Sequence, residues 1–491
     1  MGGEGPLLRR TRLTAVTTLS DFVKAYDVRG LVPDQLNVDV AHALGAAFAE
    51  VVAVADGARA VVLGHDMRPS SPELVEAMAR GITARGVDAI LIGLASTDGL
   101  YYASGALGLP GAMFTASHNP AQYNGIKFCR AGARPVGQDS GLADIRDLAQ
   151  AHLDAGVVSF EGVRPGTVTE REVLADYAGF LRGIVDLSGS RHLRVSVDAG
   201  NGMGGLTVPA VLGTGSGLPQ LPLTIDPMYF ELDGTFPNHE ANPLDPKNLV
   251  DLQDRVRSHG ADIGIAFDGD ADRCFVVDEL GNPVSPSAIT AMIARREVAR
   301  EVAAGRDPGE VAIVHNAITS AAVPEIIAED GARPVRTRVG HSYVKAVMAE
   351  HDAVFGGEHS AHYYFRDFWF ADTGMLAAMH VLAALGESEA PLSQVMAPFE
   401  RYVASGEINS TVADAAAVAE VVRERFVTDG TSVDELDGLT VTHAATDTEP
   451  LWWFNLRPSN TEPLLRLNVE AADEATMARV RDDVLTTIRE A

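Results

Sequence analysis

Short apolar segments with the character of buried strands alternate with helix patterns along most of this chain. Residues 60–64 and 89–93 are two such strands, and a helix pattern at 70–85 lies between them. A strand, a helix and a second strand at this spacing form a βαβ unit with parallel strands. The pattern returns with strands at 194–197, 311–314, 334–337 and 353–355 and with helices at 206–212, at 320–329 and after 341. Repeated units of this kind restrict the chain to the α/β class.

The C-terminal part departs from this alternation. Strands are expected at 452–456 and 464–469 around a polar loop, followed by an amphipathic helix at 473–490. A chain of 491 residues is also too long for a single core. We therefore expect three similar mixed α/β domains and a smaller C-terminal α+β domain. Their expected limits are an N-terminal extension at 1–18 and domains at 19–165, 166–280, 281–396 and 397–491.

The charge balance restricts the partners of the chain. Its net charge is −28, from 67 acidic and 39 basic residues, only four of them lysines. Nucleic acids and anionic membranes need basic patches, so we expect neither as a partner. No apolar run is long enough to span a membrane, and no apolar segment follows the basic start as in a signal peptide. The two cysteines, Cys129 and Cys274, form no disulfide framework and indicate a reducing cytoplasm.

Residues 115–120, Thr-Ala-Ser-His-Asn-Pro, place a serine where an apolar strand ends and the chain turns. Ser117 is followed by His118, and Lys127 comes ten residues later. A hydroxyl at such a corner can carry a group covalently, and cationic neighbours can hold an anion. An ordinary polar turn has the same appearance, and this segment alone favours that interpretation.

Residues 266–273 place three carboxylates, Asp268, Asp270 and Asp272, at alternate positions after a buried strand. Oxygen ligands of this kind suit Mg²⁺, with phosphate oxygens completing its shell. An EF-hand loop begins similarly, but Arg273 stands where that loop needs glycine, and a strand follows at 274–277. An aspartyl phosphatase with Asp268 as its nucleophile is the serious alternative, and a solvated acidic turn is the simplest one.

Two further segments suit a sugar phosphate. In residues 356–362 glycines come before Glu358 and Ser360, whose oxygens could hold vicinal hydroxyls of a sugar. The segment 457–463, with Arg466 behind it, resembles a phosphate cradle, because a guanidinium matches phosphate through two hydrogen bonds. Its candidate ligands are Arg457, Ser459, Asn460, Thr461 and Arg466. Each segment taken alone could be a solvated polar loop.

Other turns carry weaker signals. Gly200, Gly202 and Gly205 imitate a dinucleotide fingerprint with Asp226 downstream, but a glycine turn is the preferred interpretation. Residues 25–30 are expected to form a compact polar turn, and residues 65–68 lie at the strand edge where open α/β sheets bind ligands. The helix at 70–85 is expected to be capped by its leading serines.

Taken together and in this order, the four polar segments resemble the α-D-phosphohexomutase family, closest to its phosphomannomutase/phosphoglucomutase branch. The resemblance rests on residues 115–120, 268–273, 357–362 and 457–463 and covers almost the whole chain. It implies four domains around a central cleft, with one loop from each domain. This agrees with the domain partition expected from the strand and helix pattern.

The resemblance also implies roles for single residues. Ser117 would be the phosphoserine, and Asp268, Asp270 and Asp272 would hold one Mg²⁺ per chain together with a phosphate oxygen on Ser117. Arg273, Lys127 and His118 would stabilise the charge being transferred. The remaining residues would bind substrate: Tyr26 and Arg29 near the phosphoserine, Glu358 and Ser360 at the sugar hydroxyls, and Arg457, Ser459, Asn460, Thr461 and Arg466 at the distal phosphate.

The implied activity is the interconversion of mannose 6-phosphate and mannose 1-phosphate through a hexose 1,6-bisphosphate, which would also act as activator. Glucose phosphates are expected to be accepted, by a monomer or homodimer. Asn460 favours this reading over the aminosugar branch, which tends to have glycine there. Phosphoglucosamine mutase and phosphoglucomutase remain the near alternatives. A Mg²⁺-dependent hydrolase using Asp268 and a non-catalytic sugar-phosphate sensor are the distant ones.

The chain departs from the family pattern in three places. Residues 96–99 read Ser-Thr-Asp-Gly where relatives carry Thr-Pro, residues 314–319 lack a lysine that some relatives use, and Ala361 replaces a usual glycine. These departures leave the general acid/base open. His341 matches a family motif and is the candidate, ahead of His239 and Lys247.

Overall fold

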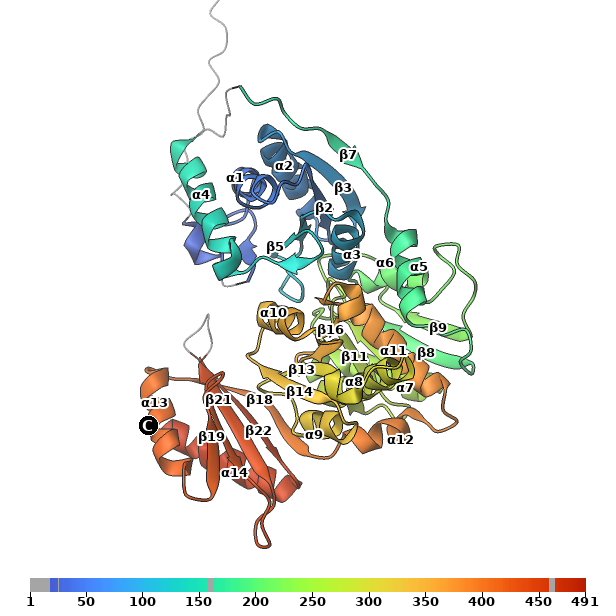
Figure 1. The fold of residues 1–491 in the computed structure, drawn as a ribbon, viewed down its shortest axis with the longest axis vertical. Helices are drawn as coiled ribbons and strands as arrows, with labels where there is room; N and C mark the ends of the chain where they lie inside the picture. Colours follow the sequence, from blue (N-terminus) through green and yellow to red (C-terminus); the bar gives the residue numbers. More distant parts are fainter. Residues whose placement is uncertain (1–17, 25, 157–161, 459–463) are drawn as a thin grey trace, which may run out of the picture.

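The computed structural model describes residues 18–24, 26–156, 162–458 and 464–491. Within them the chain forms four sheets in succession, each with its own helices (Figure 1). The first three sheets mix parallel and antiparallel pairs, and every pair in the fourth is antiparallel. The expected class, three mixed α/β domains followed by an α+β domain, is confirmed. In the described segments no helix is long and apolar enough to cross a membrane.

The first domain has the strand order β1-β5-β4-β2-β3-β7, with β6 beside β5. Its strands are β1 (Val28–Leu31), β2 (Ala60–His65), β3 (Asp88–Leu94), β4 (Gly111–Phe114), β5 (Tyr123–Arg130), β6 (Arg134–Pro135) and β7 (Val168–Glu170). Its helices are α1 (Val38–Phe48), continued by a π-helical turn at Ala49–Val54, α2 (Ser71–Ala84), α3 (Thr97–Leu107) and α4 (Leu142–Ala155). The sheet therefore extends through β7 to Glu170, past the expected domain limit at 165.

Two local expectations in this domain need correction. Of the turn expected at 25–30, residues 26 and 27 do bend, but residues 28–31 form β1, which pairs antiparallel with β5. Residue 25 lies outside the described residues. The leading serines do not cap α2, because longer-range partners take their hydroxyls. Ser71 Oγ donates to Asp66 at 2.8 Å, and Ser70 Oγ accepts from Asn124 at 2.8 Å.

The second sheet has the order β12-β11-β10-β8-β9 and the third the order β14-β13-β15-β16-β17. The second domain comprises α5 (Leu174–Ile184), β8 (Leu193–Asp198), α6 (Gly204–Val211), β9 (Leu223–Met228), α7 (Val250–His259), β10 (Ile263–Phe267), β11 (Cys274–Val277) and β12 (Pro283–Val284). The third comprises α8 (Pro286–Ala303), β13 (Ala312–Asn316), α9 (Ala322–Glu329), β14 (Arg333–Thr337), α10 (His341–His351), β15 (Phe355–Gly357), β16 (Tyr363–Phe365), β17 (Ala371–Asp372), α11 (Gly374–Gly386) and α12 (Leu392–Met396). The second sheet ends at Val284, past the expected limit at 280.

The fourth domain is an antiparallel sheet in the order β18-β22-β21-β20-β19 with two helices. Its elements are β18 (Val403–Thr411), α13 (Ala415–Phe426), β19 (Thr431–Asp434), β20 (Leu439–His443), β21 (Trp452–Pro458), β22 (Leu464–Ala471) and α14 (Glu474–Glu490). The closing helix begins as its sequence indicates, because Asp473 accepts a hydrogen bond from the backbone N–H of Thr476 and caps it.

The hydrophobic cores divide the chain differently from the sheets. The first domain has its own large core, and so does the fourth. One continuous core, however, runs through the second and third domains, joining strands of both sheets to α8 and α11, and three first-domain residues, Tyr101, Cys129 and Ala133, pack into it. The second and third domains therefore form one packed body, seen at the centre of Figure 1.

The glycines after β8 serve packing between segments. A Cβ atom at Gly202 would lie 2.6 Å from the carbonyl oxygen of Gly269, and one at Gly205 would lie 2.2 Å from that of Phe230. Asp226 lies on β9, where it accepts hydrogen bonds from Ser196 and Arg255. These contacts support the glycine-turn interpretation over a dinucleotide site.

Candidate active site

The serine segment leaves the carboxyl end of β4 and turns sharply. Ser117 is 3% exposed and has a φ of 48°, a left-handed conformation that non-glycine residues rarely adopt. Its backbone N–H donates to Thr115 Oγ1 at 2.9 Å. Strain of this kind persists only where the surroundings fix it, and it is common at catalytic residues.

The carboxylate segment leaves the carboxyl end of β10 in the second domain. Asp268, Asp270 and Asp272 are at most 1% exposed, and one ligand atom from each lies within 4.8 Å of the others. The predicted convergence of the three carboxylates is therefore present in the structure.

The two segments meet at Ser117. Its Oγ donates to Asp268 Oδ2 at 2.7 Å, and Arg273 Nε donates to the same oxygen at 2.9 Å. A Cβ atom at Gly269 would lie 2.4 Å from the carbonyl oxygen of Ser117, so the backbones themselves are in close contact. The serine of the first domain and the carboxylates of the second thus form one site.

Lys127 on β5 enters the carboxylate cluster. Its Nζ lies 2.7 Å from Asp270 Oδ2 and 2.5 Å from Asp272 Oδ2. Burial acts to raise the pKa of Asp270, but Lys127 overcomes this and holds it below its usual range. Burial and the neighbouring carboxylates raise the pKa of Asp272. One lysine therefore offsets only part of the negative charge.

The cluster fits a hard divalent cation. Asp270 Oδ1 and Asp272 Oδ1 are buried and accept no hydrogen bond from the residues that the structure describes. Buried carboxylate oxygens without donors are costly unless a cation offsets them. Oxygen-only ligands in this arrangement suit Mg²⁺.

His118 differs from its predicted role as a cation. Burial, together with Arg273 and Arg29, holds its pKa well below the ordinary value, so the imidazole is neutral. Its Nδ1 lies 2.7 Å from Arg273 Nη2 and 3.2 Å from Ser117 Oγ. A neutral ring here can orient the serine and the arginine, but it adds no positive charge.

The two residues predicted from the opening motif take different positions. Arg29 on β1 turns to the serine segment, where its Nη1 donates to the Asn119 side chain. The ring of Tyr26 packs edge-on against His341, with 5.5 Å between ring centroids, and against Tyr343. Tyr26 therefore joins the first domain to the start of α10 in the third.

In the third domain Glu358 is 2% exposed and its carboxylate is already bonded. Oε1 accepts from Asn316 Nδ2 and from the backbone N–H of Gly340, both at 3.0 Å, and Oε2 accepts from Tyr364 at 2.6 Å. Ser360, two residues on, is partly exposed. A carboxylate can accept about four hydrogen bonds, so these three leave Oε2 able to accept one more from a sugar hydroxyl.

His341, the candidate acid/base, begins α10. Burial and the nearby Lys345 lower its pKa to about 3, so its ring is neutral near pH 7. The weaker candidates lie elsewhere. His239 pairs with the buried Asp198 at 2.9 Å, and Lys247 is a 62% exposed side chain beside Glu240 and Asp245.

In the fourth domain Arg457 and Arg466 converge on one carboxylate. Arg457 Nη2 lies 3.1 Å from Glu407 Oε2, and Arg466 Nη1 lies 3.3 Å from Oε1. The two guanidinium groups are therefore placed to bind a single anionic group. Ser459, Asn460 and Thr461 lie outside the described residues.

Sequence reasoning missed three side chains around the site. Arg68, 1% exposed, donates to backbone carbonyls of the serine segment, including that of Ser117 at 3.0 Å. Thr97 donates to Asp270 Oδ2 at 2.6 Å. His362 Nδ1 lies 3.9 Å from Asp272 Oδ1. Arg68 had a signal, because residues 65–68 follow a strand at the ligand-binding edge, and His362 closes the motif at 357–362. Thr97 lies in the departure at 96–99, which gave no role for it.

A buried pair in the third domain was also missed. Lys345 Nζ lies 2.7 Å from Asp372 Oδ1, and His362 Nδ1 lies 3.1 Å from Oδ2 of the same carboxylate. The ammonium also sits over the ring of Tyr101 of the first domain, 4.0 Å from its centroid. Lys345 is thus a buried cation near His341, and no local sequence pattern predicts it.

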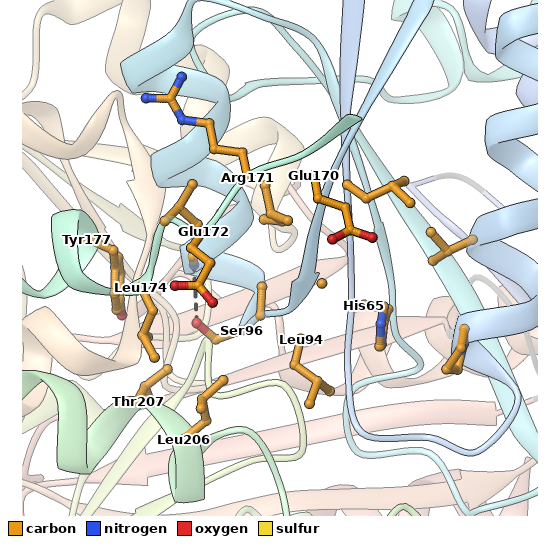
Figure 2. A pocket seen from close by; sticks show the side chains of 18 of the residues that line it. His65, Leu94, Ser96, Glu170, Arg171, Glu172, Leu174, Tyr177, Leu206 and Thr207 are labelled. Atoms are coloured by element: carbon orange, nitrogen blue, oxygen red, sulfur yellow. Dashed lines mark hydrogen bonds between the residues drawn. The ribbon is translucent and has the colours of Figure 1, made fainter. Parts of the chain in front are cut away.

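A separate cavity of about 590 Å³ lies beside α3, between the first and second domains (Figure 2). Its wall is largely apolar, with Leu94 and Leu206 among its residues. The carboxylates of Glu170 and Glu172 point into it, whereas Arg171 points away (Figure 2). None of the predicted site residues lines it, so it is distinct from the serine and carboxylate site.

Four family profiles match the chain in order. They are described as phosphoglucomutase/phosphomannomutase alpha/beta/alpha domain I, at residues 21–153, domain II, at 175–281, domain III, at 285–402, and the C-terminal domain, at 407–487. Together these matches extend over most of the chain.

Comparisons with individual proteins point to the same family as the profiles. A phosphomannomutase of Escherichia coli is 37% identical over 478 residues, which is 96% of this chain and 100% of that protein. A protein of Xanthomonas campestris pv. campestris named phosphohexose mutases is 37% identical, over 96% of this chain and 99% of its own length. The crystal structure of a phosphoglucomutase/phosphomannomutase family protein from Burkholderia thailandensis is 30% identical, with a TM-score of 0.83 over 96% of this chain and 97% of that one.

The four-domain fold, the serine beside its carboxylates and these likenesses define a phosphohexomutase, a class of isomerase. Within that class the chain belongs to the phosphoglucomutase/phosphomannomutase family, as its four motifs predicted.

Proposed function

We propose that this chain interconverts mannose 6-phosphate and mannose 1-phosphate, and also accepts glucose phosphates, through a phosphoserine at Ser117. The observation that carries the proposal is the 2.7 Å contact between Ser117 Oγ and Asp268 Oδ2. It joins a strained, buried hydroxyl to a carboxylate cluster that contains both Lys127 and Arg273. Phosphoryl transfer requires mainly positioning and charge neutralisation, and such a site supplies both.

In the proposed cycle the phosphoryl group moves from Ser117 Oγ to the free hydroxyl of a hexose monophosphate. The bond from phosphorus to the serine oxygen breaks as the bond to the sugar oxygen forms, and a base takes the hydroxyl proton. The resulting hexose 1,6-bisphosphate turns round, and the Ser117 oxygen takes the phosphoryl group from its other end. The proton returns to the sugar oxygen released there, so the net change is isomerisation.

The chain's own charges suit this transfer. Arg273 and Lys127 lie on the two sides of the carboxylate cluster and would offset the charge on the phosphoryl oxygens. Asp268, Asp270 and Asp272, with an oxygen on Ser117, would hold one Mg²⁺ per chain. When bound, that ion supplies further neutralisation of the phosphoryl charge.

The remaining roles belong to the same proposal. Arg457 and Arg466, with Ser459, Asn460 and Thr461, bind the phosphate that is not transferred. Glu358 and Ser360 hold sugar hydroxyls, and Tyr26 and Arg29 lie at the phosphoserine side. His341 exchanges the hydroxyl proton: its ring is neutral near pH 7 and has a lone pair, but with a pKa of about 3 it is a weak base that returns the proton readily. Free, buried Cys129 and Cys274 support a reducing cytoplasm as the location.

The test is the intact mass of the protein before and after incubation with glucose 1,6-bisphosphate or mannose 1,6-bisphosphate and Mg²⁺. We expect a gain of one phosphate, about 80 Da, that is absent in Ser117→Ala. Ser258→Ala, which removes an exposed serine of α7, is the matched control and should gain the phosphate. No serine-dependent gain under any condition would overturn the proposal.

Turnover of mannose, glucose and glucosamine 1-phosphates by the same preparation then ranks the substrates. A hydrolase using Asp268 would keep its activity in Ser117→Ala and release inorganic phosphate. No observation favours that alternative, because Asp268 Oδ2 is already bonded to Ser117 and Arg273.

A further inference from the structure

The first turn of α3 connects three domains at the carboxylate cluster. Thr97, the first residue of this helix, is fully buried and contacts Asp270 twice. Its hydroxyl donates to Asp270 Oδ2 at 2.6 Å, and its backbone N–H donates to the Asp270 carbonyl oxygen at 3.0 Å. A residue of the first domain thus fixes both the main chain and the side chain of a carboxylate in the second.

The two carboxylate oxygens of Asp270 differ in their hydrogen bonds. Oδ2 accepts hydrogen bonds from Thr97 Oγ1 and from Lys127 Nζ, at 2.6 and 2.7 Å. Oδ1 is buried and accepts no hydrogen bond from the described part of the chain. Two donors on Oδ2 therefore leave Oδ1 as the oxygen available to a cation within the cluster.

The turn that carries Thr97 is itself held firmly. Asp98 is fully buried, and its Oδ2 accepts from Tyr177 of the second domain and from Thr373 of the third, both at 2.7 Å. Ser96 caps the helix by accepting from the backbone N–H of Gly99 at 3.1 Å. Ser96 and Gly99 also line the cavity beside α3, whereas Thr97, which follows Ser96, contacts Asp270.

We propose that Thr97 is a positioning residue: by holding Asp270 through Oδ2, it leaves Oδ1 for a metal ion that the carboxylate cluster would bind. Groups that hydrogen-bond to the ligands of a metal fix their orientation, and their loss costs about 10- to 100-fold in metal affinity. The inference rests on the proposed metal site at Asp268, Asp270 and Asp272.

The test compares Thr97→Val, which keeps the shape but loses the donor, with Thr97→Ser, which keeps the donor. Mn²⁺, an oxygen-preferring and spectroscopically visible cation, is titrated into each metal-free protein by calorimetry and electron paramagnetic resonance. We expect the Kd of Thr97→Val to rise by about 10-fold or more, and that of Thr97→Ser to stay within about 3-fold.

Thr207→Val is the matched control, because it removes another buried helical hydroxyl, whose one bond among the described residues is to the carbonyl of Met203, the residue before α6. Its Mn²⁺ affinity should equal that of the native protein. If Thr97→Val does not fold, Thr97→Ala against Thr97→Ser gives the same comparison. The melting temperature of each protein in chelator measures the packing effect separately.

Equal Mn²⁺ affinity in native protein and Thr97→Val, or equal weakening in Thr97→Val and Thr97→Ser, would overturn this inference alone. Failure of the native protein to bind Mn²⁺ would instead overturn the metal site of the proposed function. The two failures are therefore distinguishable in one set of titrations.

Discussion

Arg68 Nη2 donates to the backbone carbonyl of Ser117 at 3.0 Å. The same guanidinium donates to the carbonyls of Asn119, Pro120 and Tyr123 at 2.7 to 3.0 Å, and its Nε pairs with Asp66. A single buried arginine thus satisfies four carbonyl groups of one loop. The left-handed conformation of Ser117 is stabilised by this contact.

Arg68→Lys should therefore disturb the serine without removing the charge beside Asp66. A lysine has one nitrogen and cannot reach four carbonyls, so some are left buried and unpaired. We expect unfolding to become easier by about 1–3 kcal/mol, and phosphate incorporation at Ser117 to slow by about 100-fold. Chemical denaturation and time-resolved intact mass measure the two effects. Arg146→Lys, at a partly exposed arginine of α4 that pairs with its neighbour Asp147, should change neither. An Arg68→Lys protein with native phosphate incorporation would refute the role of Arg68.

Divalent cations should stabilise the metal-free protein through the carboxylate cluster. A ligand that binds only the folded state at 100 times its Kd adds about 2.7 kcal/mol to the free energy of unfolding. We expect Mg²⁺ to raise the melting temperature of the native protein and EDTA to reverse it. Asp270→Asn should lose this response, whereas Asp254→Asn on the exposed side of α7 should keep it. A response that survives Asp270→Asn would place the ion elsewhere.

Asp98 should make stability depend on pH. Burial raises the pKa of Asp98 to about 6, well above its value in the unfolded chain. Between about pH 4 and pH 6 the folded state alone holds this proton, so the free energy of unfolding falls as pH rises through that range. The total loss from this group is about 3 kcal/mol.

Asp98→Asn removes the titration while its side-chain oxygen can still accept from Tyr177 and Thr373. Relative to the native protein, the variant should gain stability steadily from pH 4 to pH 7. Urea denaturation at several pH values gives the difference. A constant difference across the range would show that Asp98 does not titrate there.

The convergence of Arg457 and Arg466 on Glu407 predicts an anion site in the fourth domain. Arg457→Ala should weaken glucose 6-phosphate binding by about 10- to 100-fold, because a charge-assisted hydrogen bond contributes about 1.5–3 kcal/mol. Calorimetry with the Ser117→Ala protein, which cannot turn over, measures this directly. Arg479→Ala removes an arginine of the same domain that pairs with Glu449, and it should bind normally. Unchanged binding in Arg457→Ala would exclude the cradle.

The sequence was informative where local patterns determine the structure. Buried strands such as β4 and β10 are continuous apolar runs, and polar residues that follow them lie at the same edge of a sheet. β4 and β10 belong to different sheets, so the placing of Ser117 and Asp268 in one site came from the family resemblance that the four motifs carry. The four motifs then identified the family.

Long-range contacts were not predictable in the same way. The hydroxyl of Ser71 bonds to Asp66 instead of capping α2. Burial, with Arg273 and Arg29 beside the ring, lowers the pKa of His118 and keeps it neutral. Lys345 is buried only because Asp372, on a distant strand, faces it. Arg273 and Asp372 lie far from their partners in the sequence, and Asp66, five residues before Ser71, competes for its hydroxyl only in the folded chain, so no local pattern carries this information.

The continuous core of the second and third domains has a consequence for how the molecule comes apart. Two segments that share one hydrophobic interior cannot lose it separately, so they should unfold as one cooperative unit. The fourth domain has a separate hydrophobic core, and it contacts the third domain through polar pairs such as that of Arg336 with Asp434. The chain can therefore be divided at residue 403 but not at residue 285. A chimaeric protein could take its fourth domain from a relative, whereas the second and third domains must come from the same parent.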